Sequence, residues 1–377
     1  MRTARDLSLI VLLLVATACT TDRTRRAYLR QNAATLSPPD RVVIVIPGFG
    51  VTRLFDPVTK RHVWGTARAT VHSGFPEDLD LPPGKDGLPG RDRLVPRGWV
   101  GSRGPVNTGW QLTEALRKYG GYTVGETIHP FFYDWRLSAR DNAAHLGEMV
   151  ERVSRGRKVD LVTHSAGAVV ALTYVKLAGG GDRVERLIMI APVQRGVIDA
   201  FRLFVRPERF LRRTFSAELV ATWPFLYELL PAAGTFVLGP DGQPLEFDAW
   251  RAETWPRVSA GHLPLPQVLA RARAFRDELA AAPMPAGVRA AVMAGDCVPT
   301  ARAILRRDDG TFAFYPRELR REEEHLRPLM FEPGDGTVPV SSAAGGGDAQ
   351  LFCDGHQGIA TDPNVHRAML RALGRDE

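Results

Sequence analysis

Ser165, Asp335 and His356 follow one another along the chain as the three residue types that nucleophilic acyl transfer requires. A serine hydroxyl becomes a good nucleophile only when a histidine accepts its proton and a carboxylate orients that histidine. Residues 159–162 predict a buried strand that runs into a helix through a turn with Ser165 at its apex. Such a turn, a nucleophile elbow, pushes the hydroxyl out of the sheet and needs small neighbours such as Ala166.

The acid and the base are expected on loops that follow later strands. Residues 289–294 predict a strand, and a loop rich in proline and glycine carries Asp335 further along the chain. A second short strand at 349–352 leads almost directly to His356. This order of serine, acid and histidine is typical of α/β-hydrolases, with His356 as general base and Asp335 holding its tautomer. Asp296, just after the first of these strands, is the alternative acid, and plain loop positions are the alternative roles for Asp335 and His356.

A continuous β-branched run at residues 41–46 predicts a strand that is buried on both faces of a parallel sheet. The run ends in Pro-Gly-Phe-Gly at 47–50, where glycines let a backbone amide approach a substrate closely. We therefore expect the backbone amides of Phe49 and Ala166 to form an oxyanion hole, the second of them at a helix N-terminus. An ordinary strand-to-helix turn is the alternative for residues 47–50.

A set of short motifs occurs in order between residues 40 and 375. They are Pro-Gly-Phe-Gly at 47–50, Tyr-Asp-Trp-Arg at 133–136, Thr-His-Ser-Ala-Gly at 163–167, Thr-Trp-Pro-Phe-Leu-Tyr-Glu-Leu-Leu-Pro at 222–231, Gly-Asp-Gly-Thr-Val-Pro at 334–339 and the late His356. In these motifs the chain resembles the lecithin:cholesterol acyltransferase family, which includes lysosomal phospholipase and phospholipid:diacylglycerol acyltransferase. The resemblance implies an α/β-hydrolase fold, lipid acyl groups as substrates and a triad of Ser165, Asp335 and His356. The glycine loop and the residues after His356 depart from the usual pattern of that family.

The length of 377 residues is compatible with one hydrolase core that carries a large insertion. We predict the α/β class, an α/β-hydrolase fold with a mostly parallel central sheet and helices on both faces. The core is expected at 41–197 and 286–377, with an inserted cap or lid at 198–285. The Tyr-Asp-Trp-Arg motif at 133–136 is expected to lock a loop near the site rather than to perform chemistry.

The predicted cap begins with a stretch, residues 198–230, that mixes apolar and aromatic side chains with arginines. A basic amphipathic stretch of this kind suits an anionic lipid surface. A cap helix that packs on the core and leaves its arginines in solvent is the alternative. Segment 62–99, rich in proline and glycine, predicts a long loop that could form a second lid element. Residues 122–128 predict a strand.

The N-terminal residues set an expectation for the compartment. Two arginines precede an apolar run at 7–18, which is too short for a spanning helix and suits a signal peptide. We predict a lipoprotein-type signal peptide at 1–18, lipidation at Cys19 and a tether at 19–40. The chain is then an exported lipoprotein of the cell envelope, in the outer membrane of a cell that has two membranes, and plain secretion is the alternative.

The net charge of +7 raises the question of nucleic acid, but no nucleic-acid motif accompanies it and export argues against such a partner. The sequence contains neither H-E-x-x-H nor paired C-x-x-C, so no metal or cofactor is predicted. We predict an enzyme that acts on ester-linked acyl chains through an acyl-serine: a lipase or phospholipase if water is the acceptor, an O-acyltransferase if an alcohol is. Its expected partners are an acyl-lipid substrate, such as a phospholipid, and the membrane surface, reached through the anchor and the cap. The alternative is a catalytically silent lipoprotein that uses the fold to bind lipid or a partner.

The cysteines predict one disulfide. If Cys19 is lipidated, Cys297 and Cys353 remain, and each comes just after one of the late strands. Neighbouring parallel strands lie about 4.8 Å apart, within the reach of a disulfide. The alternative is a pair of small buried hydrophobic residues.

Overall fold

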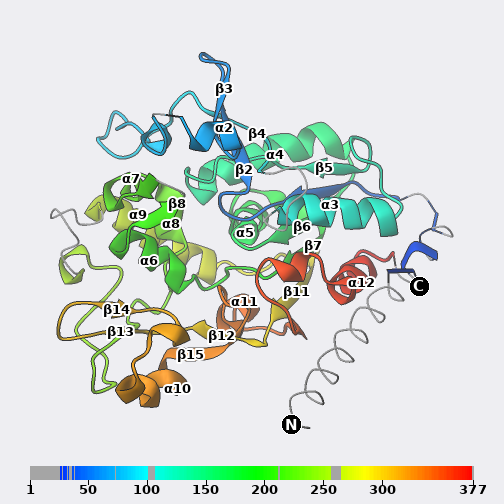
Figure 1. Cartoon of the computed structure of the whole chain (residues 1–377). Coiled ribbons are helices and arrows are strands. Elements are labelled where there is room, and N and C mark those ends of the chain that lie inside the picture. The colour runs from blue at the N-terminus through cyan, green and yellow to red at the C-terminus, as the bar shows by residue number, and fades with distance from the viewer. Residues whose placement is uncertain are drawn as a thin grey trace, which may run out of the picture.

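The computed structural model of the chain describes most of the sequence after residue 38 (Figure 1). The described residues are 26–27, 29–31, 33, 36–37, 39–72, 74–100, 107–210, 213–255 and 265–375. The predicted signal peptide at 1–18 and the predicted lipidation site, Cys19, lie outside them.

A six-stranded sheet forms the centre of the molecule, and every neighbouring pair in it is parallel. In sheet order the strands are β16 (Gln350–Phe352), β11 (Arg289–Gly295), β7 (Val184–Ile190), β6 (Val159–His164), β1 (Val43–Ile46) and β5 (Ile128–Pro130). The carboxyl ends of parallel strands meet at one edge of a sheet, so loops that follow β1, β6 and β16 can converge on one site.

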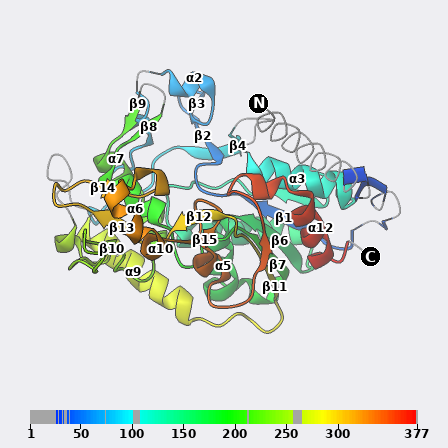
Figure 2. The same ribbon diagram turned by 60° about the horizontal axis from the view of Figure 1, so that its bottom comes forward.

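Helices cover both faces of this sheet (Figures 1 and 2). Because successive side chains of a strand point to opposite faces, Ile44 and Ile46 of β1 pack in one hydrophobic cluster while Val43 and Val45 pack in the other. The first cluster includes residues of α4 (Ala139–Ser154) and α5 (Gly167–Leu177), and the second includes residues of α3 (Thr108–Tyr119) and α12 (Pro363–Ala372). The predicted α/β-hydrolase fold class is therefore confirmed. Among the described helices, none is long and apolar enough to cross a membrane.

The remaining elements lie outside the central sheet. Before α3 they are β2 (Thr52–Asp56), β3 (Arg61–Trp64), α2 (Ala67–Thr70), η1 (Glu77–Leu79) and β4 (Val95–Trp99). Between β6 and β11 they are η2 (Gly180–Asp182), α6 (Ile198–Val205), β8 (Glu208–Phe210), β9 (Arg213–Phe215), α7 (Ala217–Ala221), α8 (Pro224–Glu228), β10 (Val237–Leu238), η3 (Ala252–Thr254) and α9 (Pro266–Ala281). After β11 they are β12 (Val298–Ala301), β13 (Ile304–Arg306), β14 (Phe312–Ala313), η4 (Pro316–Glu318), η5 (Arg321–Leu326), α10 (Arg327–Met330), β15 (Phe331–Gly334), α11 (Val340–Ala344) and η6 (Gly358–Ala360).

The segment expected to be the cap, 198–285, begins at α6 but does not stand alone. Its strand β10 pairs in parallel with β13, which pairs in turn with β14, and both of these belong to the stretch after β11. The guanidinium of Arg206 also reaches Glu318 across this boundary, at 2.7 Å. The excursion between β11 and the acid loop therefore packs together with the insertion (Figure 1), although the sequence placed it in the core.

Two local expectations differ from the structure. Segment 62–99 contains β3, α2 and β4, and β3 and β4 flank β2 in a three-stranded antiparallel sheet, where a long loop was expected. Pairing with β2 organises these short strands: β4 contains Pro96 and Gly98, which disfavour a strand, and β3 is only four residues long. The strand expected at 122–128 begins only at Ile128, because a turn closed by bonds from the amides of Thr127 and Ile128 to the carbonyl of Thr123 precedes it.

Glu228, at the end of α8, is a buried carboxyl that contacts the start of α4. Its Oε2 accepts the amide of Ala139 at 2.7 Å. Burial raises the pKa of Glu228 to about 8, although that bond and the nearby Arg276 act in the opposite direction. The folded state therefore holds this proton more tightly than the unfolded state, in which the pKa is near 4.5.

We predict that the contribution of Glu228 to the free energy of unfolding falls as the pH rises from about 4.5 to about 8, the interval between its unfolded and folded pKa values. Glu228→Gln keeps an acceptor for the amide of Ala139 but cannot ionise, so it should remove this contribution. The difference in unfolding free energy between the variant and the unaltered chain should therefore be more favourable to the variant at pH 8 than at pH 5. Denaturant unfolding of both proteins at the two pH values measures the effect. An equal pH slope in the two proteins would show that Glu228 does not titrate in this interval.

Candidate active site

The nucleophile elbow lies between β6 and α5. Ser165 has a φ of 55°, in the left-handed region that non-glycine residues rarely adopt, and its amide donates to the carbonyl of Ile190 on β7 at 3.0 Å. A Cβ on Gly167 would lie 2.4 Å from the carbonyl oxygen of Pro47, so only glycine fits where the elbow meets the end of β1. Thr163, which replaces the usual glycine two residues before the serine, is fully buried.

The side chains of Ser165, His356 and Asp335 form one hydrogen-bonded chain. His356 Nε2 lies 2.9 Å from Ser165 Oγ, and His356 Nδ1 lies 2.7 Å from Asp335 Oδ2. All three residues are buried, with Ser165 8% and His356 9% exposed. The structure thus brings together the three residues expected from the sequence. In this arrangement a proton can pass from Ser165 to His356, and the carboxylate of Asp335 holds the histidine ring in place.

The acid loop is built to keep Asp335 ionised. Oδ1 of Asp335 accepts the amides of Thr337 at 2.9 Å and Val338 at 2.6 Å, while Oδ2 remains for the histidine. Burial would raise the pKa of Asp335, but the His356 ring and these two amides together hold that pKa below its usual value. The hydroxyl of Thr300 accepts the amide of Gly336 at 2.8 Å and so ties the loop to β12. Asp335, and not Asp296, therefore carries the carboxylate that contacts His356.

The predicted disulfide between Cys297 and Cys353 is confirmed. The Cα atoms lie 4.9 Å apart, just beyond the point where Gly295 of β11 pairs with Phe352 of β16. The bond joins the start of the acid-bearing excursion to the loop that carries His356. It therefore restrains two of the three site loops against each other.

The two amides expected to form an oxyanion hole lie on the segments that meet at the serine. Ala166 is the N-cap residue of α5, and a Cβ on the neighbouring Gly48 would lie 2.9 Å from the Cβ of Ser165. Within the described ranges, the backbone amides of Phe49 and Ala166 donate no hydrogen bond. Both amides are thus free donors close to the serine, as an oxyanion hole requires.

The Tyr-Asp-Trp-Arg motif fixes the loop after β1. The hydroxyl of Tyr133 donates to the carbonyl of Pro47 at 3.0 Å, and the indole of Trp135 donates to the carbonyl of Thr52 at 3.1 Å. The guanidinium of Arg136 is fully buried and bonds the carboxylates of both Asp134 and Asp92. The motif is therefore a lock, as the sequence predicted, and its second carboxylate comes from the segment expected to be a long loop.

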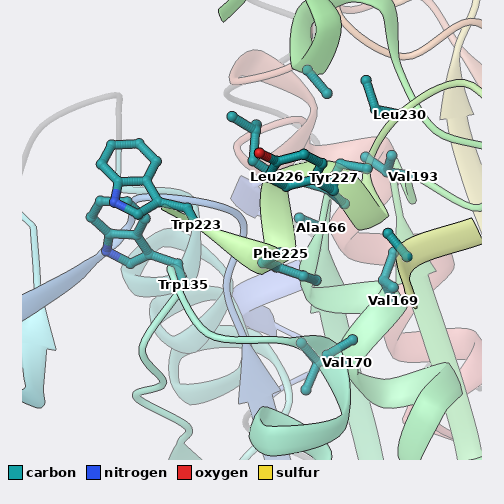
Figure 3. Packing of buried hydrophobic residues seen from close by; sticks show 14 of the residues in the cluster. Trp135, Ala166, Val169, Val170, Val193, Trp223, Phe225, Leu226, Tyr227 and Leu230 are labelled. Atoms are coloured by element: carbon teal, nitrogen blue, oxygen red, sulfur yellow. The ribbon is translucent and has the colours of Figure 1, made fainter. Parts of the chain in front are cut away.

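A cluster of aromatic side chains lies beside the elbow. The ring of Phe49 contacts those of Trp135 and Trp223, with centroids 4.9 Å and 6.2 Å apart, and that of Phe225 at 6.4 Å. Figure 3 shows residues of α8 in the same hydrophobic cluster as Ala166 and the first turn of α5. The surroundings of the serine are thus apolar on the side of α8.

His164 is a functional residue that the sequence did not reveal. Its Nε2 donates to the carbonyl oxygen of His356 at 2.9 Å, and the two rings lie 4.8 Å apart. Burial, together with the neighbouring His356, lowers the pKa of His164 to about 3, so the ring is neutral. His164 therefore positions the loop of the base from the strand that carries the nucleophile, and a partner 192 residues away leaves no local signal.

Replacing His164 by alanine leaves the carbonyl of His356 buried without a donor, which costs roughly 1–3 kcal/mol. We expect His164→Ala to lower kcat about 10- to 100-fold, with a smaller change in KM, because the base loses its position. His164→Gln retains an N–H donor and should recover part of the loss. Steady-state kinetics of the two variants on a soluble ester measures this. A kcat for His164→Ala equal to that of the unaltered chain would show that His164 does not position the base.

A metal centre is not indicated in the part of the chain that the structure describes. No group of three or more His, Cys, Asp or Glu side chains in it could hold a metal ion. The arrangement at Ser165 can perform proton transfer and nucleophilic attack with protein groups alone.

The parallel sheet, the elbow and the serine–histidine–aspartate chain define an α/β-hydrolase. Residues 107–237 match the lecithin:cholesterol acyltransferase family, which confirms over that segment the resemblance indicated by the motifs. The matched segment contains the Tyr-Asp-Trp-Arg motif, the elbow and α8, whereas Asp335 and His356 lie after it.

Individual proteins show weaker similarity. Uncharacterized protein YJR098C of Saccharomyces cerevisiae is 27% identical over 155 residues, which is 40% of this chain and only 23% of the yeast protein. The structure of the Tle4-Tli4 complex contains a chain with 15% identity and a TM-score of 0.55, and the match covers 90% of this chain and 100% of that one. The mature lipase BlEst2 of Bacillus licheniformis has 13% identity and a TM-score of 0.45, over 90% of this chain and 95% of that one. The likeness to the chain of the Tle4-Tli4 complex shows that the two chains share a fold.

Proposed function

We propose that this chain is a serine-dependent lipid acyl hydrolase or O-acyltransferase that works through an acyl-Ser165 intermediate. Ser165 Oγ attacks the ester carbonyl carbon while its proton passes to His356 Nε2. The amides of Phe49 and Ala166 stabilise the oxyanion, and the departing alcohol takes the proton from His356. Water or a second alcohol then gives its proton to His356 Nε2 and attacks the carbonyl carbon of the acyl-serine. The bond to Ser165 Oγ breaks, Oγ takes the proton back from His356, and the acid or a new ester leaves.

One observation carries this proposal: the hydrogen-bonded chain of 2.9 Å and 2.7 Å from Ser165 through His356 to Asp335. A binding protein would have no use for a strained serine at φ 55° whose hydroxyl contacts a carboxylate-paired histidine. The match of residues 107–237 to the lecithin:cholesterol acyltransferase family and the apolar cluster beside the elbow support lipid acyl groups as the substrate.

The location of the enzyme is part of the proposal. We infer export through the segment 1–18, lipidation at Cys19 and action at a membrane surface. These inferences rest on the sequence, and the residues that carry the first two lie outside the described ranges. Of the cap arginines expected to meet anionic lipid, Arg202 pairs with Asp199 and Glu208 and Arg206 pairs with Glu318, so these two already have carboxylate partners.

The experiment incubates the purified chain with a phospholipid labelled in one acyl chain, with and without a long-chain alcohol or a sterol. Release of labelled fatty acid in both arms identifies a hydrolase, and a labelled ester in the second arm identifies an acyltransferase. Phospholipid that binds but stays intact in both arms contradicts the proposal and favours the silent lipid-binding protein.

A further inference from the structure

A cavity of about 570 Å³ lies apart from the triad, between the end of α5, the loop 194–198, α9 and the start of α11. None of Ser165, Asp335 and His356 lines it. Its walls include apolar side chains, among them those of Leu172 and Trp250. The volume is in the range of small-molecule sites in proteins.

The residues that line the cavity carry mostly positive charge. Five cationic residues line it, and Asp277 is the only carboxylate among the lining residues. The cationic residues are Lys176, Arg195, Arg273, Arg276 and Arg302. Asp277 already accepts from Arg273 at 2.9 Å, one turn earlier on α9, so it balances one of the five charges.

Arg276 is the buried member of this set, and it is 7% exposed. Its Nη2 donates to the carbonyl of Gln194 at 2.6 Å, while its Nε and Nη1 have no hydrogen-bond partner among the described residues. Burial lowers the pKa of Arg276 to about 10 and raises that of the nearby Glu228 to about 8. The carboxyl of Glu228 accepts the amide of Ala139, and no hydrogen bond joins it to Arg276 among the described residues, so Arg276 has no hydrogen-bonded carboxylate partner.

Two of the other cations, Lys176 and Arg195, have no carboxylate partner among the described residues. Lys176 Nζ donates to the backbone carbonyl of Leu279 at 2.6 Å, whereas Arg302 forms an ion pair with Glu332 at 4.0 Å. The guanidinium of Arg195 makes no hydrogen bond within the described part of the chain, although its backbone amide donates to Ser342. Like charges around one cavity repel one another, and an anion placed among them offsets that repulsion.

We propose that this cavity is a binding site for a phosphate group, either free phosphate or the phosphate of a lipid. Guanidinium groups match phosphate oxygens with paired N–H donors, and a lysine adds a point charge. Three cations without a paired carboxylate, Lys176, Arg195 and Arg276, favour a dianion over the single charge of a fatty acid carboxylate. The apolar walls can take the glycerol and the first carbons of a lipid that carries the phosphate. The proposal does not depend on the catalytic role of Ser165.

Titration calorimetry of the full chain at low ionic strength tests the site with two probes. One is inorganic phosphate, and the other is an ether-linked dihexyl glycerol phosphate, which has no ester to cleave. We expect saturable binding of one equivalent of at least one probe, weakened by added salt. Arg195→Gln and Lys176→Gln should each weaken that binding about tenfold or more, because each removes a charged donor.

Arg271→Gln is the matched control, since Arg271 lies on α9 but pairs with Asp86 and does not line the cavity. It should bind both probes like the unaltered chain. Binding of both probes identifies a phosphate-sized site that also admits a lipid, and binding of the lipid probe alone identifies lipid as the source. Absence of saturable binding of either probe, or equal affinity in Arg195→Gln, Lys176→Gln and Arg271→Gln, would overturn the proposal.

Discussion

Ser165→Ala should abolish nearly all ester turnover, with a loss of roughly 10⁴ to 10⁶ in kcat, as removal of a triad nucleophile causes in other enzymes. The hydroxyl is the only group at the elbow apex that can form an acyl ester, and its partner is His356 Nε2 at 2.9 Å. Activity on a chromogenic ester, compared at equal protein concentration, measures the effect.

Loss of activity must be separated from loss of folding. Ser165 adopts a φ of 55°, where glycine is unstrained, so Ser165→Gly should be at least as stable as the unaltered chain and equally inactive. Thermal unfolding of the three proteins supplies the control. Retention of most activity by a folded Ser165→Ala chain would refute the acyl-serine mechanism.

Asp335→Asn should lower kcat by about 10⁴, because an amide cannot hold the required tautomer of His356 and cannot stabilise the imidazolium. The carboxylate accepts from His356 Nδ1 at 2.7 Å, and its other oxygen is fixed by two backbone amides. Asp296→Asn is the matched control: it makes the same change at the neighbouring strand end, on a residue whose carboxylate does not contact His356. We expect its kcat to stay within about tenfold of the unaltered value, well inside the range of a lost peripheral hydrogen bond.

Parallel kinetics of the two aspartate variants decides between them. If Asp296→Asn proved the more damaging change, the acid would have to be reassigned to the end of β11.

The features of the fold that follow from local chemistry were predictable. The β-branched run ending at Ile46 and the apolar run before Ser165 each predicted a buried parallel strand, because continuous apolar character over a few residues is typical of strands covered on both faces. The same reasoning predicted the late strands that precede Asp335 and His356 and brought Cys297 within reach of Cys353. The strands were predicted from runs of a few residues, whereas Asp335 and His356 were placed by the order of serine, acid and histidine along the chain.

The features that were missed depend on partners far along the chain. His164 donates a hydrogen bond to a carbonyl on another loop. Strand β10 pairs with β13, although β11 lies between the two in the sequence. Strands β3 and β4 form because each pairs with β2. The two nitrogens of Arg276 that have no hydrogen-bond partner among the described residues, Nε and Nη1, are likewise visible only once α9 is packed on α5. Pairings of this kind depend on tertiary contacts, which local propensity does not encode.

The central claim is that Ser165 is the nucleophile of this chain. A p-nitrophenyl alkylphosphonate tests it most directly, because a catalytic serine displaces p-nitrophenolate and keeps the phosphonyl group as a stable mimic of the tetrahedral intermediate. We predict release of one p-nitrophenolate per chain, loss of esterase activity in parallel, and the phosphonyl mass on the peptide that contains Ser165. The Ser165→Ala chain should release none. A chain that hydrolyses esters while its Ser165 peptide stays unlabelled, or that carries the label on another residue, would contradict the account.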